Sequence, residues 1–286
     1  MNIKLVFLDL DGTLLTEEMQ ITEKTRSVIA RAKEKGVQFV ACTGRPYSGL
    51  PRNVLDTLEI AYAITGTGTS IYKYPEKECI YADCLDSKLG AQLYRTFSEH
   101  DVHIDVFIEG MGYASNRTQE QIERLDKSEQ LKNYFRKSRA AIEDPEQLIL
   151  EKEGKLEIIN LNFYPEPNGT YKKYEWALDY LKTFPELHAV TGGGHNLEIS
   201  QKTASKGNAL RMFAERMGVD ISQTMAFGDT QNDISMIQAA GIGVAMGNAT
   251  GDVKEAADYV TKTNEEDGVA YALEKLVLNR DNSVEK

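Results

Sequence analysis

Cysteine is scarce in this chain, and the residues present do not form a disulfide framework. The 286 residues include three cysteines, Cys42, Cys79 and Cys84, with no Cys-x-x-Cys pair among them. This odd, scattered set favours free thiols in a reducing compartment, so the predicted location is the cytoplasm. No apolar run approaches the roughly 20 residues that a membrane helix needs. The opening MNIKLVF is also too short a run for a signal peptide.

Positive charge is in short supply as well. Lys and Arg number 33 against 44 Asp and Glu, which leaves a formal net charge of −11. This balance argues against a general nucleic-acid-binding protein, which needs a basic face to meet phosphates. None of the four histidines has a partner at metal-ligand spacing. An anionic substrate would therefore need a local cation that overcomes the overall negative field.

What the chain does have is an alternation of apolar strands and amphipathic helices. Hydrophobic residues make up 41% of the sequence, enough for a sizeable core. Residues 3–8 are almost wholly apolar, as in a parallel strand that is covered on both faces. The alternation predicts an α/β fold with a parallel sheet. The expected strands are 37–42, 61–65, 224–227, 242–246 and 259–261, and the expected helices are 22–35, 205–217, 234–239 and 268–278.

The alternation stops in the middle of the chain. Residues 84–188 combine helices with strands of alternating polarity, which is typical of an α+β unit. The sequence thus predicts a second domain at 84–188, inserted into a discontinuous first domain formed by residues 1–83 and 189–286. Within the insertion the expected helices are 87–100, 119–139 and a segment around Trp176, and the expected strands include 105–108 and 156–160.

Two carboxylates end the first predicted strand, because LVFLDLDGT places Asp9 and Asp11 two positions apart. Both would face the carboxyl edge of the sheet, where ligands of open α/β folds bind, and Gly12 allows a sharp turn there. Close carboxylates repel each other unless a cation lies between them or one of them is protonated. Together with Asp229, which ends a later strand, they offer the hard oxygen ligands that suit Mg²⁺. The alternative is a helix cap with an ordinary Asp-Gly turn.

Two further motifs carry groups suited to binding an anion. GDTQND places Asp229, Asn232 and Asp233 on one side of a starting helix, although ordinary capping explains these residue types as well. Lys206 follows a predicted cap at Ser205. A cation there is unfavourable for the helix dipole unless an anion is held nearby. The alternative is a solvated lysine.

Thr43, Gly44 and Arg45 follow the second predicted strand and could form an anion-binding loop. They offer a hydroxyl, backbone N–H groups and a guanidinium. A plain turn before Pro46 explains the same residues. The glycine-rich GTGT at 66–69 lacks the full dinucleotide-binding fingerprint and the helix that should follow it.

Taken in order, DLDGT, TGR, SKG and GDTQND resemble the four motifs of the haloacid dehalogenase superfamily of phosphotransferases. The inserted segment resembles the large α/β cap of its Cof-like sugar-phosphatase branch. The resemblance implies a Rossmann-like core domain with a parallel sheet and an inserted α+β cap domain. One departure is visible: that branch usually carries Asn-Gly-Ala after its third strand, where this chain has Thr67-Gly68-Thr69.

The resemblance also implies a role for each motif residue. Asp9 would attack phosphorus and form an aspartyl-phosphate, and Asp11, shielded from water under the cap, would hold the proton that the leaving group needs. Mg²⁺ would be bound by Asp9, the backbone carbonyl of Asp11, and Asp229. The phosphate ligands would be Thr43, Gly44, Arg45, Lys206 and Asn232. Asp233 would support Lys206 or the water at the metal.

The implied activity is hydrolysis of phosphoric monoesters of small metabolites. Sugar phosphates come first, and flavin mononucleotide and pyridoxal phosphate are further candidates. Two alternatives use the same residues: a phosphomutase or phosphotransferase that passes the phosphoryl group to a second sugar, and a catalytically silent phosphate-binding protein. The expected partner is a small phosphorylated metabolite, with neither nucleic acid nor membrane, and the expected assembly is a monomer or a homodimer.

Overall fold

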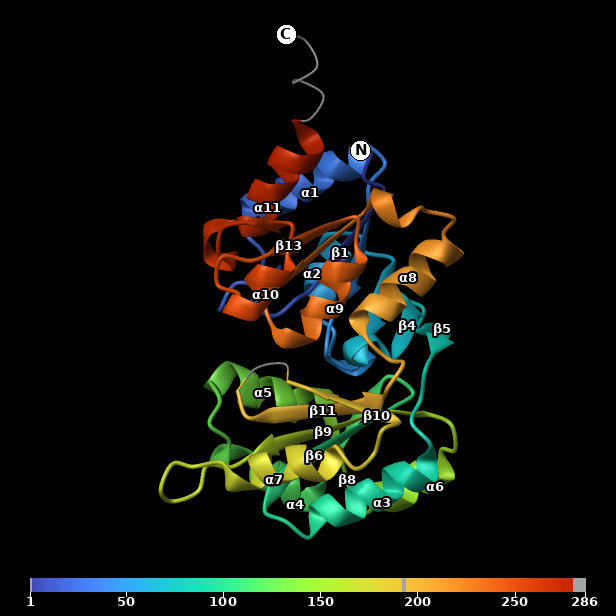
Figure 1. The fold of residues 1–286 in the computed structure, drawn as a ribbon, viewed down its shortest axis with the longest axis vertical. Coiled ribbons are helices and arrows are strands. Elements are labelled where there is room, and N and C mark those ends of the chain that lie inside the picture. Colours follow the sequence, from blue (N-terminus) through green and yellow to red (C-terminus); the bar gives the residue numbers. More distant parts are fainter. Residues whose placement is uncertain (1, 192–193, 280–286) are drawn as a thin grey trace.

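Two β-sheets organise the protein, whose computed structural model describes residues 2–191 and 194–279 (Figure 1). The first sheet has eight strands in the order β14-β13-β12-β1-β2-β3-β4-β5, and the second has six in the order β10-β11-β9-β6-β7-β8. We call the unit around the first sheet the core and the unit around the second the cap. Two connections join them, one after β5 and the other after β11.

The centre of the core sheet is β1, which pairs in parallel with β12 on one side and β2 on the other. All four of its residues are apolar and buried. Val6 and Leu8 enter one apolar cluster, and Leu5 and Phe7 enter another on the opposite face. The core strands are β1 (Leu5–Leu8), β2 (Gln38–Cys42), β3 (Tyr62–Thr65), β4 (Ser70–Lys73), β5 (Glu78–Ala82), β12 (Thr224–Gly228), β13 (Ile242–Ala245) and β14 (Tyr259–Val260).

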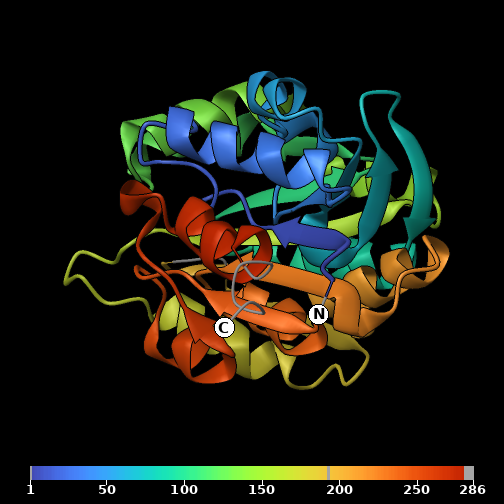
Figure 2. The ribbon, with the colours of Figure 1, turned by 90° about the horizontal axis from the view of Figure 1, so that it is seen from above.

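Helices cover both faces of the core sheet (Figure 2). The cluster that contains Val6 and Leu8 is completed by α1 (Glu23–Glu34), α2 (Arg52–Thr57), α10 (Gly251–Ala256) and α11 (Gly268–Leu273). The cluster on the other face is completed by α8 (Lys206–Arg216) and α9 (Ile234–Ala239). The predicted α/β fold is therefore confirmed, with helices close to their expected ranges.

The far edge of the core sheet departs from the all-parallel prediction. There β3 pairs antiparallel with β4, and β4 pairs antiparallel with β5. A single 3-10 turn at Gly66–Gly68 separates β3 from β4, and a short turn connects β4 to β5. Neither connection has room for the crossover that a parallel pair requires. The predicted parallel sheet is thus extended by a hairpin.

The cap sheet is antiparallel except for the pair β7 and β8. Apolar residues on one of its faces pack against α3, α6 and α7, whereas its other face is turned toward the core (Figure 1). Its strands are β6 (Val102–Ile108), β7 (Met111–Ser115), β8 (Arg139–Ile142), β9 (Leu156–Phe163), β10 (Leu187–Val190) and β11 (Asn196–Gln201), and these helices are α3 (Ser87–Ser98), α6 (Pro145–Glu151) and α7 (Lys172–Leu181).

The predicted return to the first domain at residue 189 comes too early. β10 pairs with β11, and β11 pairs with β9 in the middle of the cap sheet. The cap sheet therefore extends to Gln201, and the chain re-enters the core just before α8. Polar and apolar residues alternate over 196–200, and three of the four residues at 187–190 are apolar. Strands could therefore be expected in both segments, but their partner sheet could not.

The predicted single helix over 119–139 is wrong. Leu125 is extended, with a ψ of 133°, and Ser128 accepts a hydrogen bond from the backbone N–H of Leu131 at 3.3 Å. A side-chain cap of this kind starts a new helix, and the continuous polarity pattern does not reveal the break. The segment consists of α4 (Asn116–Glu120), a 3-10 turn (Ile122–Arg124) and α5 (Glu129–Ser138), followed directly by β8.

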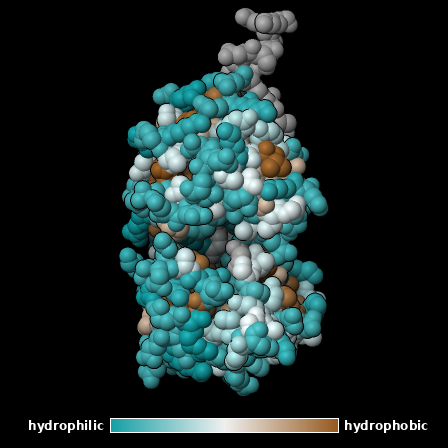
Figure 3. Space-filling view, turned by 90° about the vertical axis from the view of Figure 1, so that its left-hand side faces the viewer, coloured by the Kyte–Doolittle hydropathy of each residue, from teal (hydrophilic) through white to brown (hydrophobic). Residues whose placement is uncertain are grey.

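The surface in Figure 3 is dominated by hydrophilic residues, with apolar ones scattered between them. Within residues 2–191 and 194–279, no helix combines the length and the apolar character needed to cross a membrane. The predicted cytoplasmic location and the predicted monomer or homodimer stay predictions.

Candidate active site

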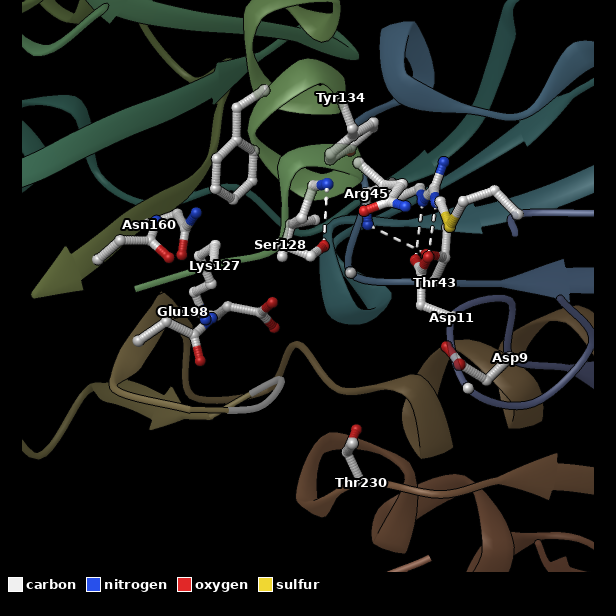
Figure 4. A pocket seen from close by; sticks show the side chains of 18 of the residues that line it. Asp9, Asp11, Thr43, Arg45, Lys127, Ser128, Tyr134, Asn160, Glu198 and Thr230 are labelled. Carbon is white, nitrogen blue, oxygen red and sulfur yellow. Dashed lines mark hydrogen bonds and ion pairs between the residues drawn. The ribbon is translucent and has the colours of Figure 1, made fainter. Parts of the chain in front are cut away.

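A cavity of about 390 Å³ lies between the core and the cap and collects the polar residues that follow the core strands. Asp9 follows β1 and Thr43 follows β2, and both line the cavity. Asp229 follows β12 and lies beside Asp9 without lining the cavity. Parallel strands deliver their carboxyl ends to one edge of a sheet, so the predicted convergence is observed. Figure 4 shows Asp9 on the core side of this cavity, and Asn160 and Glu198 on the cap side.

Lys206 is a buried cation at the bottom of the site. Its Nζ lies 2.6 Å from Oδ1 of Asp9 and 2.6 Å from Oδ1 of Asp233, and its side chain is 1% exposed. The Ser205 side chain accepts a hydrogen bond from the backbone N–H of Asn208 at 3.1 Å, and this cap places Lys206 in the first turn of α8. Burial lowers the pKa of Lys206, but the two carboxylates outweigh it and hold that pKa well above its usual value. The alternative of a solvated lysine is wrong.

Three carboxylates crowd around this lysine. Asp9, Asp229 and Asp233 each offer an oxygen within 4.8 Å of the others. Burial raises the pKa of Asp9 well above its usual range, although Lys206 opposes the shift. Burial and the nearby Asp233 raise the pKa of Asp229 to about 7. One ammonium does not balance three carboxylates, so the cluster favours the entry of more positive charge.

The hydrogen bonds of the cluster show which oxygens could bind a metal. Oδ2 of Asp233 accepts from the backbone N–H groups of Asp229 and Thr230, both at 3.0 Å, and Oδ1 is held by Lys206. Thr13 donates to Oδ1 of Asp229 at 2.8 Å. In the described part of the chain, Oδ2 of Asp9 and Oδ2 of Asp229 accept no hydrogen bond. The chemistry of these donors fits a divalent cation that prefers hard oxygen ligands.

Gly12 brings the loop after β1 close to Asp229. Its φ is +79°, and a Cβ atom at this position would lie 2.4 Å from Oδ2 of Asp229. Only glycine accepts both the left-handed conformation and the close approach. Asn248 donates to the carbonyl oxygen of Gly12 at 2.8 Å and fixes the loop from the other side.

Arg45 is committed to Asp11 and does not form the predicted anion cradle. Its Nε donates to Oδ2 of Asp11 at 2.7 Å, its Nη2 donates to Oδ1 at 2.5 Å, and its Nη1 donates to the carbonyl oxygen of Gly49 at 3.0 Å. The guanidinium also lies 4.4 Å from the ring centre of Tyr134, a residue of cap helix α5. The guanidinium fork matches a carboxylate in geometry, so Arg45 pairs with Asp11 instead of presenting its N–H groups to an anion.

Asp11 is also less shielded than predicted. Its side chain is 46% exposed, whereas that of Arg45 is 7% exposed. The expectation that the cap shields Asp11 from water is therefore wrong in this structure. Asp11 does line the cavity beside Asp9, as predicted.

Glu198 reaches from cap strand β11 to Thr67 and to Asn232, which was predicted to bind phosphate. Its Oε2 accepts a short hydrogen bond from the hydroxyl of Thr67 and a longer one from Nδ2 of Asn232, at 3.4 Å. Burial raises the pKa of Glu198. A Cβ atom on Gly44 would lie 2.8 Å from Oε1 of Glu198, so glycine at this position makes room for the carboxylate. The threonine that replaces the family's usual asparagine thus has a partner in the cap.

Thr43 and Asn232 line the cavity and retain protons for a ligand. The Thr43 hydroxyl oxygen accepts from the backbone N–H of Arg45 at 3.2 Å, which leaves the hydroxyl hydrogen available. Oδ1 of Asn232 accepts from the hydroxyl of Thr230 at 3.0 Å, which turns the amide nitrogen toward the cavity side occupied by Glu198.

A family model for haloacid dehalogenase-like hydrolases matches residues 6–273. The chain belongs to this family. The matched range spans the core and the cap and contains all of DLDGT, TGR, SKG and GDTQND. The resemblance drawn from these motifs is confirmed.

Similar proteins from Bacillus subtilis cover nearly the whole length of this haloacid dehalogenase-like hydrolase. It is 32% identical to the putative phosphatase YxeH, over 96% of this chain and 98% of that protein. It is 30% identical to 5-amino-6-(5-phospho-D-ribitylamino)uracil phosphatase YcsE, over 97% of each. A solved haloacid dehalogenase-like hydrolase from B. subtilis shares its fold with a TM-score of 0.84 at 29% identity, over 96% of this chain and 100% of that one.

Thr13 and Glu198 are among the side chains in the site of this hydrolase that were not predicted from the sequence. Thr13 orients Asp229, and its place inside the DLDGT motif was the available signal. Glu198 contacts Thr67 and Asn232 from the cap. The alternation in NLEIS could have marked Glu198 as lying on the polar face of a strand, but nothing in the sequence shows that this face meets the core.

Proposed function

We propose that this hydrolase is a Mg²⁺-dependent phosphatase that cleaves phosphoric monoesters of small metabolites, sugar phosphates among them, through an aspartyl-phosphate. The observation that carries the proposal is the contact of buried Lys206 with Asp9, beside Asp229. A dianionic phosphate is accepted there only if positive charge compensates the carboxylates. The relatives named as phosphatases support the proposal, and one of them is named for a phosphorylated ribitylamino compound.

Asp9 is the nucleophile of the proposed reaction. Its carboxylate oxygen bonds to phosphorus as the bond from phosphorus to the alcohol oxygen breaks, which leaves an acyl phosphate on Asp9. Lys206 orients this carboxylate at 2.6 Å. In the proposed reaction, the Thr43 hydroxyl and the Asn232 amide donate to phosphoryl oxygens. Mg²⁺ held by Asp9 and Asp229 would supply further positive charge to the phosphoryl group.

Asp11 carries the proton. It gives a proton to the leaving alkoxide and then takes one from the water that attacks the acyl phosphate, which releases inorganic phosphate and restores the Asp9 carboxylate. Arg45 fixes the orientation of Asp11 through two hydrogen bonds. The Asp11 side chain is 46% exposed, so solvent reaches it.

The test is release of free phosphate from p-nitrophenyl phosphate and from a panel of sugar phosphates, with Mg²⁺ or with EDTA and no acceptor. We expect release with Mg²⁺ and none with EDTA. Release only after addition of a second sugar would favour a phosphotransferase. No release from any ester, combined with retained binding of inorganic phosphate, would favour the silent binding protein and contradict the proposal.

A further inference from the structure

The face of the cap sheet that is turned toward the core carries a grid of buried polar residues. Strand register places its members in two rows across β6, β9 and β11. We call it the polar grid, and its rows are Asp105–Asn160–Glu198 and His103–Asn162–Asn196. Each member is at most 9% exposed. Burying a polar face is unfavourable unless its groups are hydrogen-bonded. The hydrogen-bond partners of each group therefore indicate the role of the grid.

Asp105 fixes the orientation of Asn160. Nδ2 of Asn160 donates to Oδ2 of Asp105 at 3.1 Å, and Oδ1 of Asp105 lies 3.1 Å from Nε2 of His103. Burial raises the pKa of Asp105, but Arg139 and His103 outweigh it and lower that pKa to about 2. The residue is therefore a fixed carboxylate acceptor. Because Asp105 holds the amide nitrogen of Asn160, the carbonyl oxygen Oδ1 of Asn160 points away from Asp105.

Two atoms of the polar grid have no partner in the described part of the chain. They are Oδ1 of Asn160, an acceptor, and Nδ2 of Asn162, a donor. The two residues are 5% and 2% exposed, and both line the cavity. Figure 4 shows Asn160 across this cavity from Asp9. Buried polar groups are rarely left unpaired in folded proteins, so a ligand in the cavity is the partner that both atoms lack.

Glu198 connects the polar grid to the phosphate-binding residues. It shares a row with Asn160, and its Oε2 accepts from Asn232 and Thr67 in the core. A ligand with its phosphate at the core end therefore reaches the grid with the remainder of its carbon chain. Asn160 and Asn162 are two positions apart on β9, about 7 Å along the strand. Both are satisfied only by a ligand that carries several polar groups.

We propose that Asn160 and Asn162 select the substrate by hydrogen bonding to hydroxyl groups of the alcohol part, several atoms beyond the ester oxygen. This inference rests on the proposed function. Hydroxyl groups suit the pair because each one donates to Oδ1 of Asn160 or accepts from Nδ2 of Asn162. The substrate class is then a phosphoric monoester of a polyhydroxylated alcohol. An apolar alcohol of the same length leaves both asparagine groups unpaired.

The experiment compares ribitol 5-phosphate with n-pentyl phosphate, which have the same carbon chain and differ in the hydroxyl groups. We expect the wild-type protein to favour ribitol 5-phosphate in kcat/KM by on the order of a hundredfold or more, because sites built to bind a hydroxyl reject analogues that lack it. Asn162→Leu, which keeps the side-chain size, should lower this ratio by at least about tenfold, mainly through the KM for ribitol 5-phosphate. Asn160→Leu should act in the same direction.

Asn53→Leu on α2 is the matched control, because Asn53 is exposed and lies outside the cavity. It should keep the wild-type ratio. A wild-type protein that hydrolyses p-nitrophenyl phosphate but shows no preference within the five-carbon pair, or rejects both, overturns the inference and leaves the proposed function standing. An unchanged ratio in Asn162→Leu also overturns it. Failure to hydrolyse p-nitrophenyl phosphate or any other ester contradicts the proposed function itself.

Discussion

At the scale of single residues, Asp9 is both the proposed nucleophile and one of three crowded carboxylates. It is buried beside Asp229 and Asp233, and among residues 2–191 and 194–279 the cation paired with it is Lys206. Asp9→Asn should lower kcat by at least about a thousandfold, because the amide is no nucleophile. The thermal midpoint should not fall, since a crowded negative charge is removed. Phosphate release and a thermal melt measure the two effects.

The control for this substitution is Asp179→Asn, at a carboxylate whose side chain is 76% exposed. It should leave both activity and thermal midpoint at the wild-type values. Near-wild-type turnover in Asp9→Asn would show that another group attacks phosphorus.

Lys206 should matter for folding as much as for catalysis. Removing one partner of a buried ion pair leaves the other charge uncompensated, at a cost of about 3–5 kcal/mol. Lys206→Met should therefore lower the free energy of unfolding by that amount, measured by urea denaturation. The loss in kcat/KM should correspond to about 2–4 kcal/mol of transition-state stabilisation.

A double variant separates these two roles of Lys206. Lys206→Met combined with Asp233→Asn should recover much of the lost stability, because Asp233 is then neutral and Asp9 is the remaining carboxylate that the lysine held. Activity should stay low, since the cation beside the nucleophile is still missing. A single variant that unfolds at the wild-type urea concentration would contradict the role of this ion pair.

At the scale of elements, the turn between β3 and β4 shows how the core accommodates the cap. Thr67 has a φ of 56° and a ψ of 27°, in the left-handed region. A β-branched residue is strained there, at a cost of about 1–2 kcal/mol, and asparagine is better tolerated. Thr67→Asn should raise the free energy of unfolding by about 1 kcal/mol, and its amide can still donate to Glu198. Urea denaturation measures the change.

Thr57→Asn provides the comparison for that substitution, because Thr57 lies in the right-handed helix α2. It should not stabilise the protein. If both variants changed stability equally, the left-handed backbone at Thr67 would not be the cause.

The sequence predicted the site better than it predicted the cap. Asp9 and Asp229 directly follow apolar strands, and parallel strands bring such residues together whatever the details of the loops. The prediction that Arg45 helps to bind an anion was wrong, because nothing in the local sequence shows that its guanidinium pairs with Asp11. The cap domain was harder to predict because its sheet depends on pairings between strands that are distant in the sequence, such as β9 with β11. In addition, the helix-capping residue Ser128 starts a new helix within a segment whose polarity pattern is continuous.

At the scale of the whole molecule, the cap is attached to the core by buried carboxylates. Oε1 of Glu157 on β9 accepts from the hydroxyls of Ser70 and Tyr72 on β4, at 2.8 and 2.7 Å. Glu198 on β11 accepts from Thr67 and Asn232. Burial raises the pKa of Glu157 and of Glu198. The position of the polar grid over Asp9 therefore depends on polar contacts rather than on an apolar interface.

The stability of the whole chain should also depend on pH and metal through Asp229. Its pKa is raised from 3.8 to about 7 by burial and by Asp233. Between these values the unfolded chain loses a proton that the folded protein keeps, so this group makes the metal-free protein less stable as the pH rises. Mg²⁺ binds the carboxylate form of the folded protein and should offset the decline. Thermal melts in EDTA and in Mg²⁺, from about pH 5 to about pH 8, measure both effects.

Asp229→Asn separates this effect from the titration of other groups. The variant has no proton to lose at this position, so its thermal midpoint in EDTA should fall less steeply with pH, and its response to Mg²⁺ should be small. Asp179→Asn should keep both the slope and the metal response, because its side chain is exposed. If Mg²⁺ stabilised Asp229→Asn as strongly as the wild-type protein at pH 7, the cation would bind elsewhere. The unbonded oxygens of Asp9 and Asp229 would then need another role.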